Sequence, residues 1–127
     1  MNEQVIEGIK RMCGKVLRLN NGWYHFIYRR QHYLYIPDEA NKMIRISIPH
    51  VASGNDYSKE TVGAVVNETN REVKFVKASV LNNGSISLDY DHKVESGMNV
   101  NTIVRHVVVT LFAASEYLLE KLNSFKL

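Results

Sequence analysis

The stretch that most constrains the fold is "VVNETNREVKFVKASVLNNGSISLDYD", residues 65–91. Its last seven residues alternate strictly, with Ile86, Leu88 and Tyr90 on one face of a strand and serines and aspartates on the other. The "NNG" just before them supplies residues that tolerate the positive φ of tight hairpins. A period of two fixes which side chains face the core. The stretch therefore predicts a helix end, a strand over 72–81 and an antiparallel return strand.

The rest of the chain adds helices and strands around this hairpin. Residues 15–22 fit either an extension of the first helix or a short strand ending at an Asn-Asn-Gly turn. The other expected elements are a helix at 3–13, an aromatic hairpin at 23–37 cut at 29–31, a strand at 42–49 ended by Pro49, a helix at about 58–70 capped by Asp56 or Ser58, and a helix at about 100–123. The order α-β-β-β-α-β-β-α predicts an α+β fold, with a five-stranded antiparallel sheet and flanking helices.

Length and composition indicate one ordinary globular domain over residues 1–127. The chain is 45% hydrophobic and 23% charged, with a formal net charge of +3, which is a weak basic bias for a nucleic-acid binder. The single cysteine, Cys13, excludes an internal disulfide and fits a reducing compartment. We find no secretory signal and no uninterrupted apolar run of membrane-spanning length, so we expect a cytoplasmic protein with no membrane partner.

Recognisable catalytic motifs are missing from the sequence. No serine lies in a G-x-S-x-G turn, and no glycine-rich phosphate loop is present. The five histidines lack zinc-ligand spacing, although His25 and His32 lie on opposite arms of the first hairpin and could face each other. Cross-strand packing is the favoured interpretation of this pair over a zinc site. We expect no enzyme activity, no cofactor and no metal.

Three phrases carry a resemblance to a known family: "FIYRRQHYLYIPDEANKMIRISIP" (26–49), residues 65–91 quoted above, and "VRHVVVTLFAASEYLLEKL" (104–122). With an aromatic hairpin, a strand ending in proline, a helix with Asn67 and Asn70, and a long final helix, the chain resembles the YbjN-like branch of the type III secretion chaperone fold. The resemblance implies a five-stranded antiparallel sheet with flanking helices, often in a homodimer. It also implies a role in binding proteins, as a chaperone or regulator.

The last helix and the first hairpin carry the candidate binding residues. Val109, Ala113 and Tyr117 form a second apolar stripe opposite the broad apolar face of the helix, which suits either a partner surface or incidental exposure. The leading hypothesis is a non-catalytic module that binds a protein segment or itself, through the outer sheet face or this helix, with edge-strand pairing possible. Its candidate residues are Trp23, Tyr24, Tyr28, Arg29, Arg30, Tyr33, Tyr35, Val109, Ala113 and Tyr117.

A second hypothesis assigns the hairpin to single-stranded nucleic acid. Arg29 and Arg30 lie among four tyrosines, and strand aromatics with arginines can stack on bases. Tyrosine is a favoured strand residue whatever the function, and Asp38 and Glu39 lie nearby. Nucleic acid is therefore the less favoured partner.

Overall fold

The structure is a computed structural model, and it describes residues 1–125. It contains three α-helices, one short 3-10 helix and six strands within that range. In chain order they are α1 (Asn2–Cys13), β1 (Leu17–Arg18), β2 (Tyr24–Tyr28), β3 (Gln31–Asp38), β4 (Met43–Ser53), η1 (Gly54–Asp56), α2 (Lys59–Glu72), β5 (Lys77–Val80), β6 (Ser85–Lys93) and α3 (Val100–Asn123).

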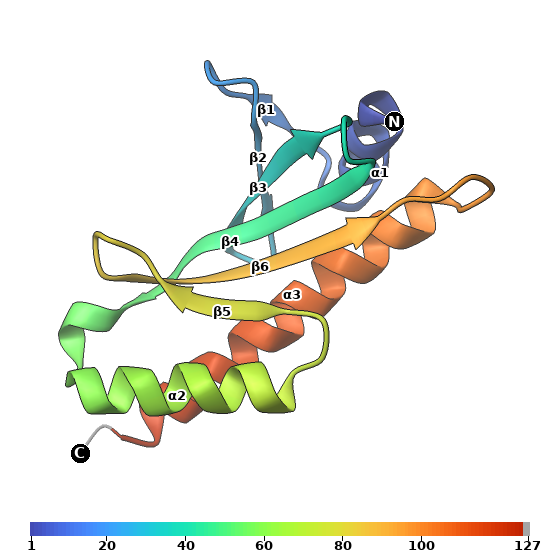
Figure 1. The fold of residues 1–127 in the computed structure, drawn as a ribbon. Coiled ribbons are helices and arrows are strands. Elements are labelled where there is room, and N and C mark those ends of the chain that lie inside the picture. The colour runs from blue at the N-terminus through green and yellow to red at the C-terminus, as the bar shows by residue number, and fades with distance from the viewer. Residues whose placement is uncertain (126–127) are drawn as a thin grey trace.

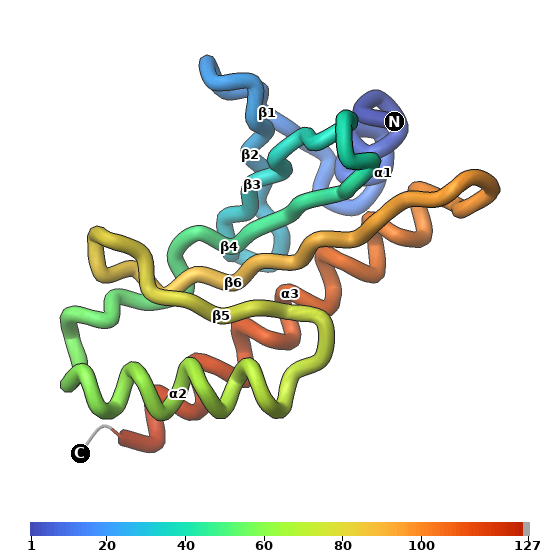
Figure 2. Tube along the Cα trace, in the orientation of Figure 1, coloured from blue at the N-terminus to red at the C-terminus, as the bar shows by residue number. Residues whose placement is uncertain are grey.

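The strands form one antiparallel sheet in the order β1-β2-β3-β4-β6-β5. Figure 1 shows α3 running diagonally behind β6, while α2 runs beside β5. The Cα trace in Figure 2 shows the strong twist that separates β1–β3 from the β6–β5 hairpin. We call the face covered by the helices the inner face and the opposite face the outer face.

This architecture confirms the α+β prediction, with one correction to the strand count. The sheet has six strands rather than five, because residues 15–22 contribute the two-residue strand β1. Two paired residues are too short for a period of two to be visible in the sequence. The ambiguity left at that segment is resolved in favour of a strand.

Two further boundaries differ from the sequence prediction. Pro49 does not end β4, which continues to Ser53 with a register shift between Ile48 and Ala52. Strand β5 begins only at Lys77, because Phe75 adopts a left-handed φ of 69° and breaks the extended backbone expected over 72–81. Prolines are tolerated where a bulge interrupts the ladder, so Pro49 marks an irregularity instead of a strand end.

The core lies between the inner face and the helices. Ile86, Leu88 and Tyr90 are buried there as the alternation predicts, and Phe26 from the first hairpin joins them. The fully buried α3 side chains are Val104, Val107, Val108, Leu111, Ala114, Ser115, Leu118 and Leu122. Helix α3 is thus the central packing element of the domain.

The expectation that no segment approaches a membrane span needs correction for α3. Within residues 1–125 this helix alone is long and apolar enough to cross a membrane, judged by length and composition. Its apolar residues are largely the ones buried against the sheet. Packing in the core accounts for its composition, as it does in many core helices.

Local polar bonds fix the starts of α2 and α3. The Ser58 hydroxyl accepts a hydrogen bond from the Thr61 N–H, and the Asn99 side chain accepts one from the Thr102 N–H. Between the two candidate caps, Ser58 is therefore the one used. Gly63 does not mark a close approach to the sheet, since a Cβ there would have no atom within 4 Å.

The outer edge of the sheet at β5 is closed by a side chain. The Asn70 amide of α2 accepts from the Ala78 N–H at 2.6 Å and donates to the Ala78 C=O at 3.0 Å. One asparagine thus replaces the hydrogen bonds that a neighbouring strand would make. Asn67, one turn earlier, is exposed and makes no side-chain hydrogen bond within the described part of the chain.

Candidate protein-binding surface

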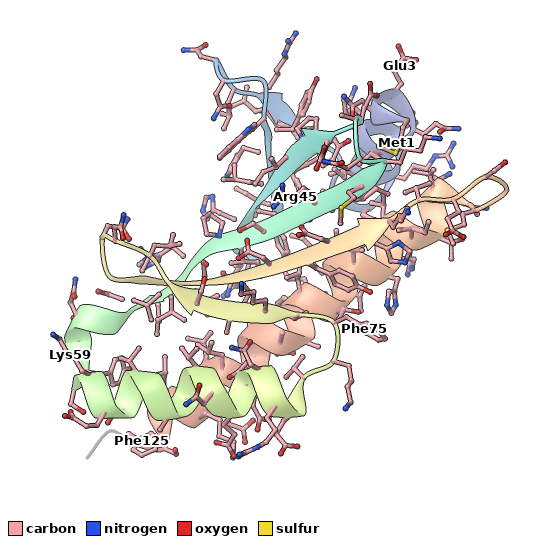
Figure 3. The ribbon with its side chains drawn as sticks, viewed as in Figure 1. Met1, Glu3, Arg45, Lys59, Phe75 and Phe125 are labelled. Atoms are coloured by element: carbon pink, nitrogen blue, oxygen red, sulfur yellow. The ribbon has the colours of Figure 1, made fainter. Side chains whose placement is uncertain are left out.

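The outer face of the sheet divides into a polar half and an apolar half. Over β4, β6 and β5, Arg45 pairs with Asp91 at 3.1 Å and with Asp38 at 3.7 Å. Figure 3 shows Arg45 on the near side of β4. Ser87, also on this half, is nearly fully buried and lies 3.2 Å from the Ser79 hydroxyl. The exposed, paired side chains of Arg45 and Asp91 are typical of a solvated sheet surface.

The half over β1–β3 carries apolar side chains instead. Pairing places Leu17, His25 and Leu34 in one row across the three strands, with Ile27 beside His32 in the next. The outer apolar patch, as we call it, consists of Leu17, Trp23, Ile27, Leu34 and Ile36. Leu17 is 54% exposed and Ile27 is 48% exposed. Adjacent exposed apolar residues on an uncovered face indicate a contact surface.

The segment that forms most of this patch is basic, and the nearest acids on the same face, Asp38 and Asp91, are paired with Arg45. Residues 8–37 contain no aspartate or glutamate, and they include the exposed cations Lys15, Arg18, Arg29 and Arg30. The chain as a whole has 13 acidic residues, so their absence from this segment concentrates positive charge beside the apolar patch. A surface of this composition attracts a ligand that is both apolar and acidic.

The patch borders an open part of the sheet edge. The Leu19 N–H donates to the Trp23 C=O at 2.8 Å, so the backbone groups of Trp23 point toward the β1 side of the sheet. Every second residue of a strand points its backbone groups to the same side, and the N–H and C=O of Ile27 therefore face this edge too. Strand β1 pairs only with Tyr24 and His25 and stops before reaching Ile27. A cavity of about 250 Å³ lies there, lined by Cys13, Lys15, Leu17, His25, Phe26 and Ile27.

Cys13 lies half-buried in the lining of this cavity. Burial raises the pKa of the Cys13 thiol above its ordinary value, which lowers the thiolate fraction at neutral pH.

A second exposed surface follows α3. Residues at alternating spacings of four and three are all exposed: Thr102, His106, Val109, Ala113, Glu116 and Glu120. We call this row the α3 stripe. Among them, the His106 ring lies edge-on to the sheet residue Tyr90, with the two ring centres 5.9 Å apart. Val109 is 42% exposed. Tyr117 lies to one side of it, half-buried, with the Lys121 ammonium 5.6 Å from its ring centre.

The structure corrects the position of the hairpin tyrosines. Tyr33 and Tyr35 are fully buried on the inner face, where Tyr35 donates a hydrogen bond to the Asn2 side chain of α1. Tyr24 stacks on Tyr35, and the half-buried Tyr28 packs edge-on against Phe112 of α3. Tyr33 and Tyr35 are therefore core residues, and a ligand on the outer face cannot contact them.

The same orientation removes the platform expected for nucleic acid. The tyrosine rings of the hairpin face the core, so they cannot stack on bases at the outer face. Arg29 lies with its guanidinium carbon 5.5 Å from the ring centres of both Tyr28 and Phe112. The Arg29 side chain therefore packs the tip of the hairpin against α3.

Sequence reasoning missed the residues that do form the patch, apart from Trp23. Leu17, Ile27, Leu34 and Ile36 were not selected because both faces of the hairpin are apolar. The sequence did contain a sign of which residues face outward. The two histidines of the hairpin lie on the same face of their strands as Ile27 and Leu34. Polar residues in a strand usually lie on its solvent-facing side.

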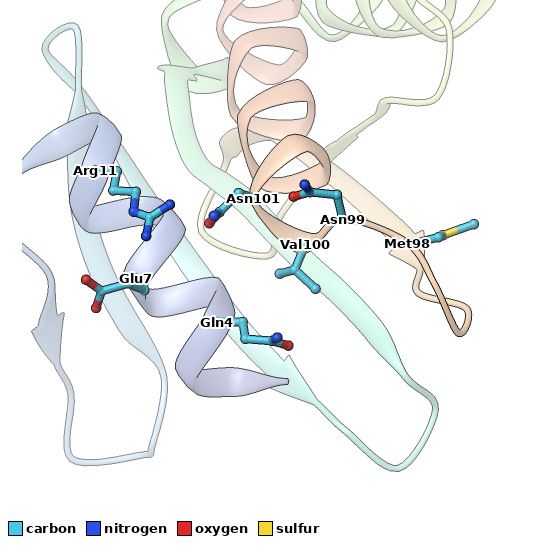
Figure 4. Close-up of a pocket in the computed structure, with 7 residues that line it drawn as sticks. All are labelled: Gln4, Glu7, Arg11, Met98, Asn99, Val100 and Asn101. Carbon is cyan, nitrogen blue, oxygen red and sulfur yellow. The ribbon is translucent and has the colours of Figure 1, made fainter.

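A polar cleft of about 330 Å³ separates α1 from the start of α3 (Figure 4). Its lining includes Gln4, Glu7, Arg11, Asn99 and Asn101. The two ionisable members, Glu7 and Arg11, are exposed. Burial and fixed charge partners tune catalytic side chains, so this cleft gives no reason to propose a reaction.

Solved structures of other proteins share the fold of this chain. No protein-family model and no curated protein matches the sequence. Among solved structures, a chain of the ExsC–ExsE complex superposes with a TM-score of 0.67 at 13% identity, covering 91% of this chain and 88% of that chain. A chain of the HopA1–SchA chaperone–effector complex superposes with a TM-score of 0.63 at 10% identity, covering 91% of each. The chain therefore shares the fold of these two chains, one of which belongs to a chaperone–effector complex.

Proposed function

We propose that this protein is a non-catalytic, chaperone-like module that holds an extended, acidic and apolar segment of another protein. The observation that carries the proposal is the outer apolar patch, which lies uncovered beside an open sheet edge and a basic segment. The fold shared with a chain of a chaperone–effector complex supports the same role. The narrower YbjN-like assignment and a cytoplasmic location remain predictions from the sequence.

The edge and the patch suit an extended segment. A strand added beside β2 would hydrogen-bond to the backbone at Ile27, and every second side chain would lie on the outer face beside Leu17 and Ile27. Acidic residues in the segment would lie near Lys15 and Arg30. Backbone pairing supplies affinity in such complexes, and the alternate side chains supply specificity.

Selection from a displayed library of random peptides tests this proposal while the natural ligand is unidentified. We expect selection on the wild-type protein to enrich peptides that combine apolar and acidic residues. Ile27→Asp should weaken the selected peptides by at least about tenfold, roughly 1.4 kcal/mol, because it places a charge in the contact. Lys77→Ala, at an exposed site on the polar half, should leave affinity unchanged. Failure to enrich any sequence, or equal binding by Ile27→Asp, would count against the proposal.

The α3 stripe suits a second copy of the chain. Arg105, which flanks the stripe, lies toward the start of the helix, and the stripe residues Glu116 and Glu120 lie toward its end. This order opposes the preference of the helix dipole, and neither Arg105 nor either glutamate forms an ion pair within residues 1–125. Two antiparallel copies would satisfy these charges mutually.

Such a pair has a definite register. A twofold axis between Val109 and Ala113 would pack Val109 of one copy against Ala113 of the other, with Arg105 and His106 near Glu116. A contact between two helices is smaller than the roughly 800 Å² per partner of a stable interface. We therefore propose a weak homodimer that forms only at high protein concentration.

Charge reversal tests this register. Light scattering over a concentration series should show the wild-type mass rising toward twice that of the monomer, and Val109→Glu should remain monomeric. Arg105→Glu should weaken association, and the double variant Arg105→Glu with Glu116→Arg should restore it. A wild type that stays monomeric at millimolar concentration, or a double variant no better than Arg105→Glu alone, would contradict the proposed pairing.

A further inference from the structure

Two histidines lie hydrogen-bonded to each other within the outer apolar patch. His25 of β2 pairs with Leu34 and His32 of β3 pairs with Ile27, so the two histidines are diagonal neighbours on the outer face. His25 Nε2 lies 2.8 Å from His32 Nδ1, and the ring centres are 5.0 Å apart. One ring donates its N–H and the other accepts with a lone pair. The facing arrangement that the sequence allowed is therefore formed, as a hydrogen bond between the two rings.

A hydrogen bond of this kind can hold one extra proton but not two. If His32 is protonated, its Nδ1–H still donates to the unprotonated Nε2 of His25, and the bond becomes charge-assisted. If both rings are protonated, two N–H groups face each other and the contact is lost. The pKa of His25 is lowered, first by burial and then by the positive charge of a protonated His32. The pair is therefore built to carry a single positive charge as the pH falls.

The segment around the pair carries positive charge only. The cavity of about 250 Å³ beside His25 is lined by one charged residue, Lys15, and by the titratable thiol of Cys13. Residues 8–37 contain no aspartate or glutamate, and the exposed Arg30 lies at the turn between the two strands that carry the histidines. A protonated pair thus finds no opposite charge in its own segment.

The acids on the same face are already engaged elsewhere. The guanidinium of Arg45, on β4, lies 3.1 Å from the Asp91 carboxylate and 3.7 Å from that of Asp38. In the part of the chain that the structure describes, no carboxylate forms an ion pair with either histidine. A carboxylate that stabilises the protonated pair must therefore come from another molecule.

We propose that the His25–His32 pair couples binding at the outer apolar patch to the uptake of one proton, so that affinity for an acidic, apolar segment rises as the pH falls from 8 to 6. This inference rests on the proposed function, because it describes how the same site is regulated. A ligand carboxylate beside the pair favours the protonated form, and by linkage the protonated form then favours the ligand. Histidine is the side chain whose charge ordinarily changes in this pH range.

An apolar anion of constant charge, anilinonaphthalene sulfonate, is the probe that tests this coupling. We expect its dissociation constant from the wild-type protein to fall about fivefold between pH 8 and pH 6. His32→Gln keeps a polar side chain but cannot take up a proton, so its affinity should change by less than about twofold. His92→Gln is the matched control: His92 lies on β6, with its Nδ1 2.8 Å from the Lys93 carbonyl oxygen, and this variant should respond as wild type does.

Two further readouts separate charge from exposure. Nile red, an uncharged apolar dye, should bind the wild type equally at both pH values. Proton resonances of the imidazole rings should show His25 titrating at lower pH in the wild type than in His32→Gln, because the charge of His32 is removed. Coinciding His25 titration curves would overturn the inference.

Three results of the dye titrations would also overturn it: sulfonate affinity that is absent or the same at pH 8 and pH 6, an equal rise in His32→Gln, or an equal rise for Nile red. The peptide selection at one fixed pH tests the binding proposal separately, so either proposal can fail without the other.

Discussion

Replacing Asn70 by alanine should be one of the most damaging single changes on the surface of this domain. Asn70 is exposed as a residue, yet its amide makes both of the hydrogen bonds to Ala78 that close the β5 edge, at 2.6 and 3.0 Å. Ala78 itself is only 3% exposed. The Asn70→Ala variant would leave a buried N–H and a buried C=O without their partner.

The expected magnitude follows from those two groups. Each typical hydrogen bond contributes about 0.5–1.5 kcal/mol net, and a buried group left unpaired costs about 1–3 kcal/mol. Alanine regains about 0.6 kcal/mol of helix propensity over asparagine. We therefore expect the free energy of unfolding to fall by about 2–4 kcal/mol for Asn70→Ala.

Asn67→Ala provides the matched control. It makes the same chemical change in the same helix, at an exposed asparagine with no side-chain hydrogen bond within the described residues. Urea unfolding followed by circular dichroism should show Asn67→Ala unchanged or stabilised by about 0.5 kcal/mol. If the two variants unfold within about 0.5 kcal/mol of each other, the assigned role of the Asn70 amide is wrong.

Three smaller effects are also expected. The fully buried Tyr33 hydroxyl has no hydrogen-bond partner within residues 1–125, so Tyr33→Phe should raise the free energy of unfolding by about 1 kcal/mol, and a decrease in a urea titration would contradict this. Asn99→Ala removes the acceptor for the Thr102 N–H. It should lower the free energy of unfolding by about 1 kcal/mol, and the same urea titration measures this change. Because the folded-state pKa of His25 is lowered, the unfolded chain binds that proton more readily, and stability should fall as the pH drops below the ordinary histidine value of about 6.5. His25→Gln should reduce that fall, and identical pH profiles for variant and wild type would exclude it.

The elements governed by local rules could be predicted from the sequence. Strand β6 was identified by its strict alternation, α2 by apolar spacing with Asp56 or Ser58 as its cap, and α3 by apolar spacing alone. Phe75 could not be placed, because its left-handed backbone depends on the closure between Asn70 and Ala78. That closure forces the intervening chain to reverse, so these residues cannot form the strand that their composition favours.

The binding surface was harder to predict than the fold. The first hairpin is apolar on both faces, and a period of two shows that its faces differ without showing which one is covered. Helix α1 decides the question by covering the face of Tyr35, which it contacts through Asn2. The cavity beside Ile27 depends on where β1 stops, which only the three-dimensional pairing reveals.

The asparagine at the β5 edge also limits how large an assembly of this chain can become. Fibre growth by edge-to-edge pairing requires two free edges on every molecule, so that each added copy offers a site for the next. Here α2 and the Asn70 amide occupy the β5 edge at Ala78, whereas the edge near Ile27 has no strand partner in the part of the chain that the structure describes. Edge-to-edge pairing between copies is therefore expected to join two molecules and then to stop. The protein can keep one edge that is able to pair without forming fibres.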